Sequence, residues 1–228
     1  MPRIVLITGA KGGLGPHVTR AFLQGGDTVV GSSRRIADAD FANERFAAIP
    51  ADLTNAGDAR ELAAAAVKRF GRIDALVHVT GGFTYGGAIP DTADQVWDEM
   101  MAVNARAAFN VLRAVIPQMR SQRSGRIVAV ASRAGVEPAA NIGAYAASKA
   151  ALVSLVRTAA LENRDAGLTV NAILPGTIDT EKNRAEDPNA DRSKWVSPDR
   201  LAALAVFLVS DAAAEITGAA IPVYGAAL

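Results

Sequence analysis

Three side chains in the second half of the sequence have types and a spacing that suit proton transfer. Ser132 follows an apolar, β-branched run, and Tyr145 and Lys149 open a helical pattern thirteen residues later. Residues four apart lie on one face of a helix, so the phenol and the ammonium would be neighbours. An unperturbed phenol has a pKa of about 10, and a nearby ammonium and a helix N-terminus both favour its ionised form. The spacing predicts a tyrosine with a lowered pKa that acts as general acid and base, although an ordinary surface pair has the same spacing.

A glycine-rich turn follows the first apolar run, and a helical pattern comes directly after it. In order, the turn reads Thr8-Gly9-Ala10-Lys11-Gly12-Gly13-Leu14-Gly15. Glycines let the backbone approach a pyrophosphate closely, and the helix that follows presents free N–H groups and a positive dipole end to that anion. The turn therefore predicts dinucleotide binding, with a purely structural turn as the alternative.

The residues after the second apolar run bear on the choice of dinucleotide. Ser33, Arg34 and Arg35 stand where an NAD site usually has an acid that binds the ribose 2′-hydroxyl. A guanidinium can hold a 2′-phosphate through two bonds, and Lys11 could add a second positive charge. We expect NADP(H) to be favoured over NAD(H), unless these arginines are only solvated loop residues.

Alternating strands and helices must position these motifs. The expected strands are Ile4–Thr8, Thr28–Ser32, Ala47–Pro50, Ala75–Val79, Arg126–Ala131, Thr169–Leu174 and Ala219–Val223. The expected helices are Gly13–Gln24, Ala56–Phe70, Ala93–Met119, Tyr145–Asp165 and Pro198–Ser210. Most strands are apolar nearly throughout, which is typical of strands covered on both faces. The pattern predicts an α/β fold with a doubly wound, seven-stranded parallel sheet, helices on both faces and ligands beyond the carboxyl ends of the strands.

Two local features modify this expectation. Pro117 lies late in the third helix and should bend or end it. The polar, highly charged stretch 181–194 is expected to be a mobile surface loop.

Composition limits the possible functions. The chain has 228 residues, of which 50% are hydrophobic, so we expect one domain over residues 1–228. A net charge of +1 argues against nucleic-acid binding, which needs a basic excess. The chain has no cysteine, and His17 and His78 lack companions at ligand spacing, so no metal site is expected. No apolar stretch approaches the ~20 residues that span a bilayer, and we expect a cytoplasmic protein without membrane association.

Together these motifs identify a resemblance. The glycine turn, Ser132, Tyr145 and Lys149 follow one another in order on the expected elements. Over essentially its whole length the chain resembles the short-chain dehydrogenase/reductase superfamily of the single-domain Rossmann type. The resemblance implies an oxidoreductase that transfers a hydride between NADP(H) or NAD(H) and a small-molecule carbonyl or secondary alcohol substrate. It also implies a homotetramer or homodimer formed through the long helices.

The resemblance assigns roles residue by residue. The catalytic residues would be Asn104, Ser132, Tyr145 and Lys149. Ser132 would orient the substrate oxygen, Lys149 would lower the pKa of Tyr145 and hold the nicotinamide ribose, and Asn104 would hold Lys149 through a water. The residues expected to contact the cofactor are Gly9, Lys11, Gly13, Leu14, Gly15, Ser33, Arg34, Asp52, Leu53, Gly81, Pro175, Gly176, Ile178 and Thr180. Of these, Asp52 and Leu53 would contact the adenine, and the segment from Pro175 to Thr180 would close over the nicotinamide.

Two positions depart from the family pattern. His78-Val79-Thr80-Gly81 stands where the family usually has Asn-Asn-Ala-Gly, so we expect either that His78 braces the central sheet in place of the first asparagine or that the fold is less stable. Val223-Tyr224-Gly225 replaces the commoner Val-Asp-Gly, which we interpret as a change in packing or in an interface. Two alternatives stay open at this point: a non-catalytic dinucleotide sensor or scaffold, and a pteridine- or quinone-type reductase.

Overall fold

The fold is built around a seven-stranded parallel sheet. The computed structural model describes residues 2–226, so Met1 and residues 227–228 of the expected domain lie outside the described residues. The strands are β1 (Ile4–Thr8), β2 (Thr28–Ser32), β3 (Phe46–Ala48), β4 (Ala75–His78), β5 (Gly125–Val130), β6 (Leu168–Pro175) and β7 (Ala220–Val223). Their order is β3-β2-β1-β4-β5-β6-β7, and each neighbouring pair is parallel. The winding direction reverses between β1 and β4, which confirms the doubly wound fold.

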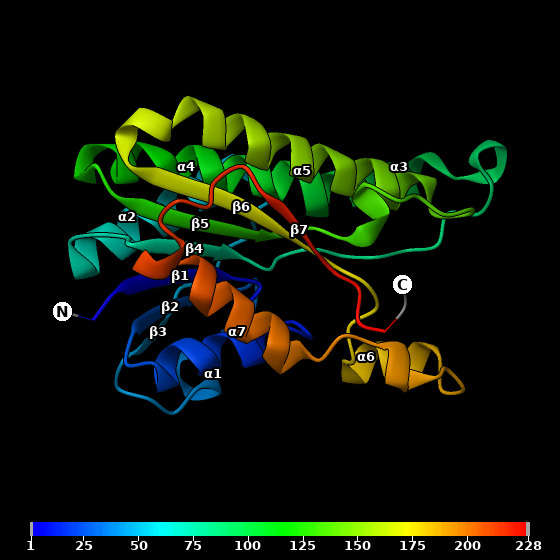
Figure 1. The fold of residues 1–228 in the computed structure, drawn as a ribbon, viewed down its shortest axis with the longest axis horizontal. Helices are drawn as coiled ribbons and strands as arrows, with labels where there is room; N and C mark the ends of the chain where they lie inside the picture. The colour runs from blue at the N-terminus through cyan, green and yellow to red at the C-terminus, as the bar shows by residue number, and fades with distance from the viewer. Residues whose placement is uncertain (1, 227–228) are drawn as a thin grey trace.

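Helices cover both faces of the sheet (Figure 1). One layer contains α2 (Ala56–Phe70), α4 (Ala107–Gln122) and α5 (Gly143–Glu162), and the other contains α1 (Gly15–Gln24) and α7 (Pro198–Leu208). Alternate residues of a strand serve the two layers: Leu6 packs in the core under α2, α4 and α5, and Ile7 packs in the core under α1 and α7. This two-sided burial explains the apolar strands. No helix in the described part of the chain is both long and apolar enough to cross a membrane.

The third expected helix consists of three consecutive segments. α3 (Asp94–Met100) leads into a π-helical segment (Met101–Arg106), which leads into α4. Of the two expected effects of Pro117, a bend or an end of the helix, the second does not occur, because α4 continues to Gln122. Pro117 lies on the exposed side of α4, where water can hydrate the carbonyl that a proline leaves without its helical partner.

The charged stretch 181–194 is partly helical, which corrects the expectation of a loop. α6 (Glu181–Glu186) begins directly after Thr180, whose Oγ1 accepts a hydrogen bond from the backbone N–H of Asn183. Arg184 on this helix donates two hydrogen bonds to Asp179, at 2.6 and 2.8 Å. A threonine cap is a recognisable start signal, which the high charge of the segment obscured.

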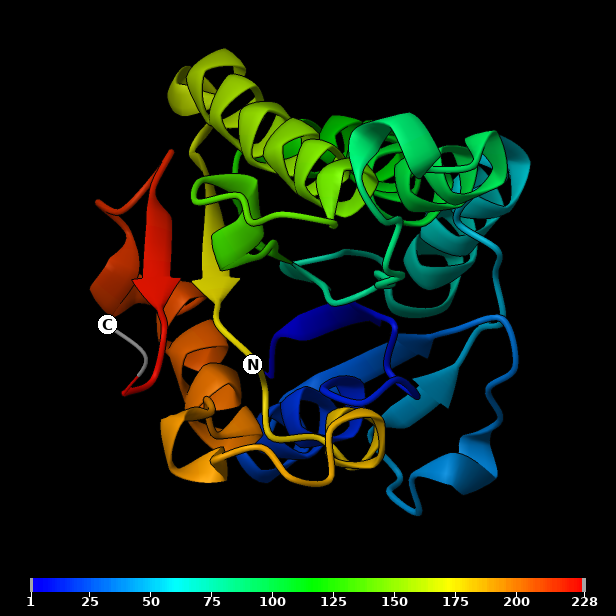
Figure 2. The same ribbon diagram turned by 90° about the vertical axis from the view of Figure 1, so that its right-hand side faces the viewer.

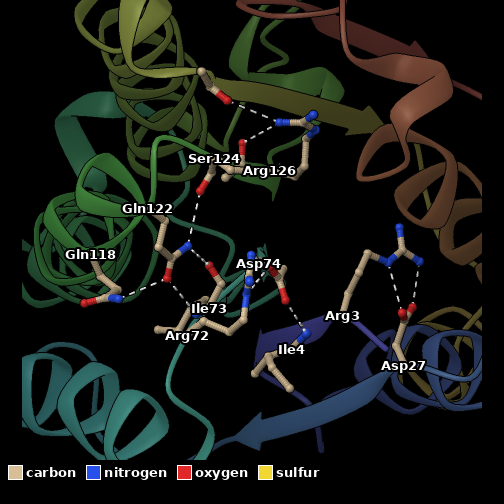
Figure 3. Close-up of polar contacts among 12 residues, drawn as sticks. Arg3, Ile4, Asp27, Arg72, Ile73, Asp74, Gln118, Gln122, Ser124 and Arg126 are labelled. Carbon is tan, nitrogen blue, oxygen red and sulfur yellow. Dashed lines mark hydrogen bonds and ion pairs between the residues drawn. The ribbon is translucent and has the colours of Figure 1, made fainter. Parts of the chain in front are cut away.

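Polar side chains hold the strands together at the amino edge of the sheet (Figure 3). Arg3 donates two hydrogen bonds to Asp27, at 2.9 and 2.7 Å. Gln122 of α4 binds both backbone groups of Ile73, accepting from its N–H at 3.1 Å and donating to its carbonyl at 2.9 Å. These contacts are structural, and none of the expected site residues takes part in them. The chemistry is therefore sought at the opposite, carboxyl edge, which faces the side where α3 and α6 lie (Figure 2).

Candidate active site

The glycine turn lies between β1 and α1, and sterics require glycine at two of its positions. Gly9 has a φ of 68°, and a Cβ there would lie 2.7 Å from the backbone nitrogen of Thr80. A Cβ on Gly15 would lie 2.1 Å from the carbonyl oxygen of Gly9. α1 begins at Gly15, and Leu14 at its N-cap makes no side-chain capping bond. The free N–H groups and the bare backbone fit the diphosphate of a dinucleotide.

The segment after β6 returns to this turn. A Cβ on Gly13 would lie 3.2 Å from Cγ2 of Thr180, so the backbone of Gly13 and the side chain of Thr180 pack closely together. The carbonyl of Ile178 accepts hydrogen bonds from the N–H of Thr180 and from the side chain of Asn183, each at 2.8 Å. These two bonds fix the backbone at Ile178. The segment from Pro175 to Thr180 starts at the buried end of β6, and its last residue, Thr180, lies beside the glycine turn.

At the ends of β1 and β2, Lys11 and Ser33 are neighbours. The backbone N–H of Lys11 donates to Oγ of Ser33 at 3.1 Å. The Lys11 ammonium lies 2.7 Å from Oδ1 of Asp40, a partner that the sequence analysis missed. Arg34 is exposed. Nothing in the local spacing signals that Asp40 folds back onto the turn.

The expected adenine contacts are fixed by polar bonds. The Asp52 carboxylate accepts from Oγ1 and N–H of Thr54 at 2.7 and 3.0 Å, and these bonds hold the pKa of Asp52 below its usual value. Nδ2 of Asn110 on α4 donates to the carbonyls of Leu53 and Thr54 at 2.9 and 3.2 Å. The sequence analysis missed Asn110, although a lone amide within the apolar face of a helix is a usable signal.

The three candidate catalytic groups meet beyond the end of β5. Ser132 follows that strand, Tyr145 lies in the first turn of α5, and the two side chains are hydrogen-bonded. Lys149 is 5% exposed, and its ammonium donates to the carbonyl of Val130 at 3.1 Å and lies 6.0 Å from the centre of the Tyr145 ring. The structure therefore assembles the serine, the phenol and the ammonium that the sequence predicted.

Burial governs the charge states of this group. Burial raises the pKa of Tyr145, and the hydrogen bond with Ser132 opposes this rise only in part. Burial also lowers the pKa of Lys149 to about 8. The prediction that Lys149 makes Tyr145 unusually acidic is wrong for this structure, because desolvation of the phenolate outweighs the attraction of an ammonium at this distance. Tyr145 is accordingly protonated at neutral pH, in the form that can donate a proton.

Asn104 lies in the π-helical segment and joins three parts of the site. Its Oδ1 accepts from the N–H of Gly82, and its Nδ2 donates to the carbonyl of Gly82 and to Oγ of Ser148, each at 3.1 Å. Ser148 in turn donates to the carbonyl of Tyr145 at 2.7 Å. Ser148, which the sequence analysis missed, thus connects Asn104 to the helix that carries the phenol.

Gly81 leaves room for two catalytic groups. A Cβ at this position would lie 2.9 Å from Oδ1 of Asn104 and 3.0 Å from Nζ of Lys149. The Asn104 amide cannot yield freely, because it is bound to both backbone groups of Gly82. Gly81 is therefore required beside Asn104 and Lys149 themselves, in addition to any contact with a cofactor.

We expect Gly81→Ala to lower kcat by about 100-fold, because shifts of about 1 Å in catalytic groups have effects of this size. Steady-state kinetics would measure the loss, with a melting curve to confirm folding. Gly82→Ala is the matched control: its Cβ would meet only the apolar side chains of Val103 and Met100, the nearest at 3.2 Å. Equal losses in the two variants would contradict this explanation.

His78 replaces the family asparagine and does brace the sheet. Nδ1 of His78 on β4 is hydrogen-bonded to Oγ1 of Thr8 on β1 at 2.8 Å, and both side chains are buried. Burial, with a smaller contribution from the charge of Lys149, lowers the pKa of His78 to about 3. His78 is therefore a neutral structural link between the strands on either side of the winding reversal. Its Nε2 has no hydrogen-bond partner within residues 2–226.

We expect Thr8→Val to destabilise the fold by about 1–3 kcal/mol, because it leaves Nδ1 of His78 buried without a partner. Urea unfolding would measure the change. Thr169→Val on β6 is the matched control, because the buried Oγ1 of Thr169 has no partner among the described residues and the change there should be close to neutral. Similar losses in both variants would show that the bond to His78 contributes little.

Aromatic rings lie next to Tyr145. The Phe83 ring contacts Tyr145 and Tyr85 edge-on, with centroid distances of 4.9 and 5.0 Å, and Tyr85 is 71% exposed. Arg133, next to Ser132, forms an ion pair with Glu137 at 2.7 Å and lies over the Tyr224 ring at 4.6 Å. Tyr224 thus packs against Arg133, and aromatic rings border Tyr145.

Comparisons with known proteins agree with this geometry. A family model described as short chain dehydrogenase matches residues 3–191. The chain is 31% identical to short chain dehydrogenase adrF of Penicillium rubens over 243 residues, covering 96% of this chain and 94% of the relative. It is also 31% identical to the 3-oxoacyl-[acyl-carrier-protein] reductase FabG of Thermotoga maritima over 238 residues, covering 98% of this chain and 96% of the relative.

Solved structures give the same result. The fold matches ElxO with NADP bound at a TM-score of 0.92 and 25% identity, covering 99% of this chain and 98% of that chain. It matches a short-chain type dehydrogenase/reductase from Mycobacterium ulcerans at a TM-score of 0.93 and 27% identity, covering 99% of this chain and 89% of that chain. With a family match over most of its length, the chain belongs to the short-chain dehydrogenase/reductase family of oxidoreductases, which act on CH–OH or C=O groups.

Proposed function

We propose that this oxidoreductase transfers a hydride between NADP(H), in preference to NAD(H), and a carbonyl or secondary alcohol substrate. The observation that carries the proposal is the meeting of Ser132, Tyr145 and Lys149 at the carboxyl edge of the sheet. The preference for NADP(H) is supported by Lys11 and Arg34 at the ends of β1 and β2, and by the NADP bound in the similar ElxO structure.

In this proposal the carboxyl edge of the sheet holds the cofactor. Backbone groups of the turn and of α1 hold the diphosphate, Asp52 and Leu53 hold the adenine, and the segment from Pro175 to Thr180 covers the nicotinamide. The full set is Gly9, Lys11, Gly13, Leu14, Gly15, Ser33, Arg34, Asp52, Leu53, Gly81, Pro175, Gly176, Ile178 and Thr180. When bound, the nicotinamide supplies or accepts the hydride.

The side chains of the protein handle the proton. In the reducing direction, Oη of Tyr145 donates its proton to the substrate oxygen, and in the oxidising direction it takes that proton back. The Ser132 hydroxyl lies beside the phenol and, with substrate present, donates its one hydrogen bond to the same oxygen. The Lys149 ammonium stabilises the negative charge that forms on Tyr145, and Asn104 holds the backbone beside Lys149.

Cofactor binding and turnover test the proposal in two steps. Fluorescence titration with NADPH and NADH measures binding, and loss of NADPH absorbance measures turnover on ketones, 3-oxoacyl thioesters, pterins and quinones. We expect both nucleotides to bind, NADPH more tightly, and a ketone or thioester to be reduced. Failure of both nucleotides to bind at millimolar concentration would overturn the proposal, as would binding without turnover on any carbonyl compound.

We also propose that residues 1–228 form one domain, and that the protein works in the cytoplasm as a homodimer or homotetramer. Large apolar side chains on the outer layer of helices support self-association: Phe109 on α4 is 44% exposed and Leu161 on α5 is 70% exposed. Light scattering of the purified protein would test the assembly. A monomer at all concentrations would contradict it.

A further inference from the structure

Asp40 forms an ion pair with the lysine of the glycine turn. Its Oδ1 lies 2.7 Å from Nζ of Lys11, and its Oδ2 accepts a hydrogen bond from the backbone N–H of Ala37 at 2.9 Å. These two contacts hold the pKa of Asp40 below its usual value, so the carboxylate is charged at neutral pH. Both of its oxygens are thus in use, and its direction is fixed.

The segment that carries Asp40 is firmly attached to the fold. Asp40 ends a short 3-10 helix (Asp38–Asp40), and Oδ1 of Asp38 accepts a hydrogen bond from the N–H of Ala48 on β3 at 2.7 Å. Ile36 and Phe41, on either side of this helix, are buried in the core under α1, and the Phe41 ring lies 4.7 Å from the Phe46 ring. The position of Asp40 is therefore set by packing on both sides of it.

The ion pair lies where the adenosine ribose of a dinucleotide is read. The backbone N–H of Lys11 donates to Ser33, the first residue after β2, and this is the place where such folds distinguish a 2′-hydroxyl from a 2′-phosphate. The second cation expected to hold a phosphate, Arg34, interacts electrostatically with Asp52. Lys11 therefore has an anionic partner before any phosphate binds.

We propose that Asp40 is a positioning residue for cofactor selectivity: by binding Lys11 it limits the preference for NADP(H) and lets the protein also use NAD(H). This inference rests on the proposed function. A 2′-phosphate carries nearly two negative charges. It must therefore either share the Lys11 ammonium with Asp40 or displace the Asp40 carboxylate from that ammonium. A 2′-hydroxyl is neutral and leaves the ion pair between Lys11 and Asp40 in place. Removal of the Asp40 charge should therefore favour NADPH over NADH.

Asp40→Asn tests this with little structural change, because asparagine keeps an oxygen for the N–H of Ala37 and loses only the charge. Asp38→Asn is the matched control: it removes the same charge from the same 3-10 helix, but at a side chain that binds Ala48 instead of Lys11. Binding of NADPH and NADH is measured by fluorescence, and binding of adenosine 2′,5′-bisphosphate and 5′-AMP by calorimetry. Neither measurement depends on turnover.

We expect Asp40→Asn to raise the ratio of NADPH to NADH affinity by about three- to tenfold at low salt, as is typical for a partly exposed ion pair facing a doubly charged group. The rise should shrink at high ionic strength. Asp38→Asn should change the ratio by less than about twofold, because the Asp38 carboxylate binds the N–H of Ala48 and forms no ion pair with Lys11. Lys11→Gln should lower the ratio, and adding Asp40→Asn to Lys11→Gln should then have little effect.

An unchanged ratio in Asp40→Asn would overturn the inference. An equal rise with and without Lys11 would also overturn it, since Asp40 would then not act through Lys11. In both cases NADPH and NADH still bind, and the proposed function stands. If neither nucleotide bound the unaltered protein, the proposed function would fail first, and this inference with it.

Discussion

Tyr145→Phe is expected to lower the rate of carbonyl reduction by about 10²- to 10⁴-fold, the range typical for loss of a general acid. The substitution removes only the hydroxyl that donates the proton, while the ring keeps its edge-on contact with Phe83. The Ser132 hydroxyl would still polarise the substrate oxygen, which accounts for a small remaining rate. Loss of NADPH absorbance at saturating substrate measures the effect.

Two controls separate chemistry from binding. The dissociation constant of NADPH should change by less than about threefold in Tyr145→Phe, because the phenol is needed for proton transfer and not for holding the cofactor. Tyr85→Phe makes the same chemical change on a ring of the same aromatic group, and this exposed side chain should have little effect on the rate. Full activity in Tyr145→Phe would remove Tyr145 from its role.

Lys149→Met is expected to lower kcat by about 10²- to 10³-fold, the cost of removing one group that stabilises developing charge. The pH profile gives a sharper test. Since burial lowers the pKa of Lys149 to about 8, the ammonium is present below that pH and lost above it. The rate of reduction by the unaltered enzyme should therefore fall as the pH rises through 8. Lys149→Arg keeps a charge at all these pH values, so its remaining activity should show no fall near pH 8.

The same lowered pKa has a consequence for stability. Between pH 8 and about 10.4 the unfolded chain keeps the Lys149 proton while the folded chain has released it, so the stability of the folded state rises with pH across that window. Below pH 8 both states are protonated, and the folded state carries the full cost of a buried ammonium. The melting temperature of Lys149→Met relative to the unaltered protein should therefore be highest below pH 8 and should decline towards pH 10.4. A constant difference would contradict the assigned pKa.

The regular elements could be read from the sequence because their signals are local. β1, β2 and α2 begin and end at the predicted residues, since apolar runs there are bounded by glycine or polar residues. Ser132 follows β5, and Tyr145 and Lys149 lie near the start of α5, so the predicted alternation of strands and helices places all three at one edge of a parallel sheet. The family pattern supplied the assignment of Asn104.

Features that depend on distant neighbours could not be read in this way. The pKa of Tyr145 is set by how much of the phenol is buried, which no spacing reports, and the prediction had the wrong sign. The partner of Lys11 is 29 residues away at Asp40, on a short helix with no sequence signal of its own. The bonds of Asn110 and Ser148 likewise connect elements that are far apart along the chain.

Because of the π-helical segment Met101–Arg106, the site depends on the exact number of residues that precede α4. A helix of regular α geometry rotates by about 100° per residue, so deleting one residue here would turn everything on one side of the cut by that angle relative to the other. Either Asn104 would leave Gly82 and Ser148, or the apolar face of α4 would leave the core. A redesign that straightened the helix by removing one residue would therefore lose the site.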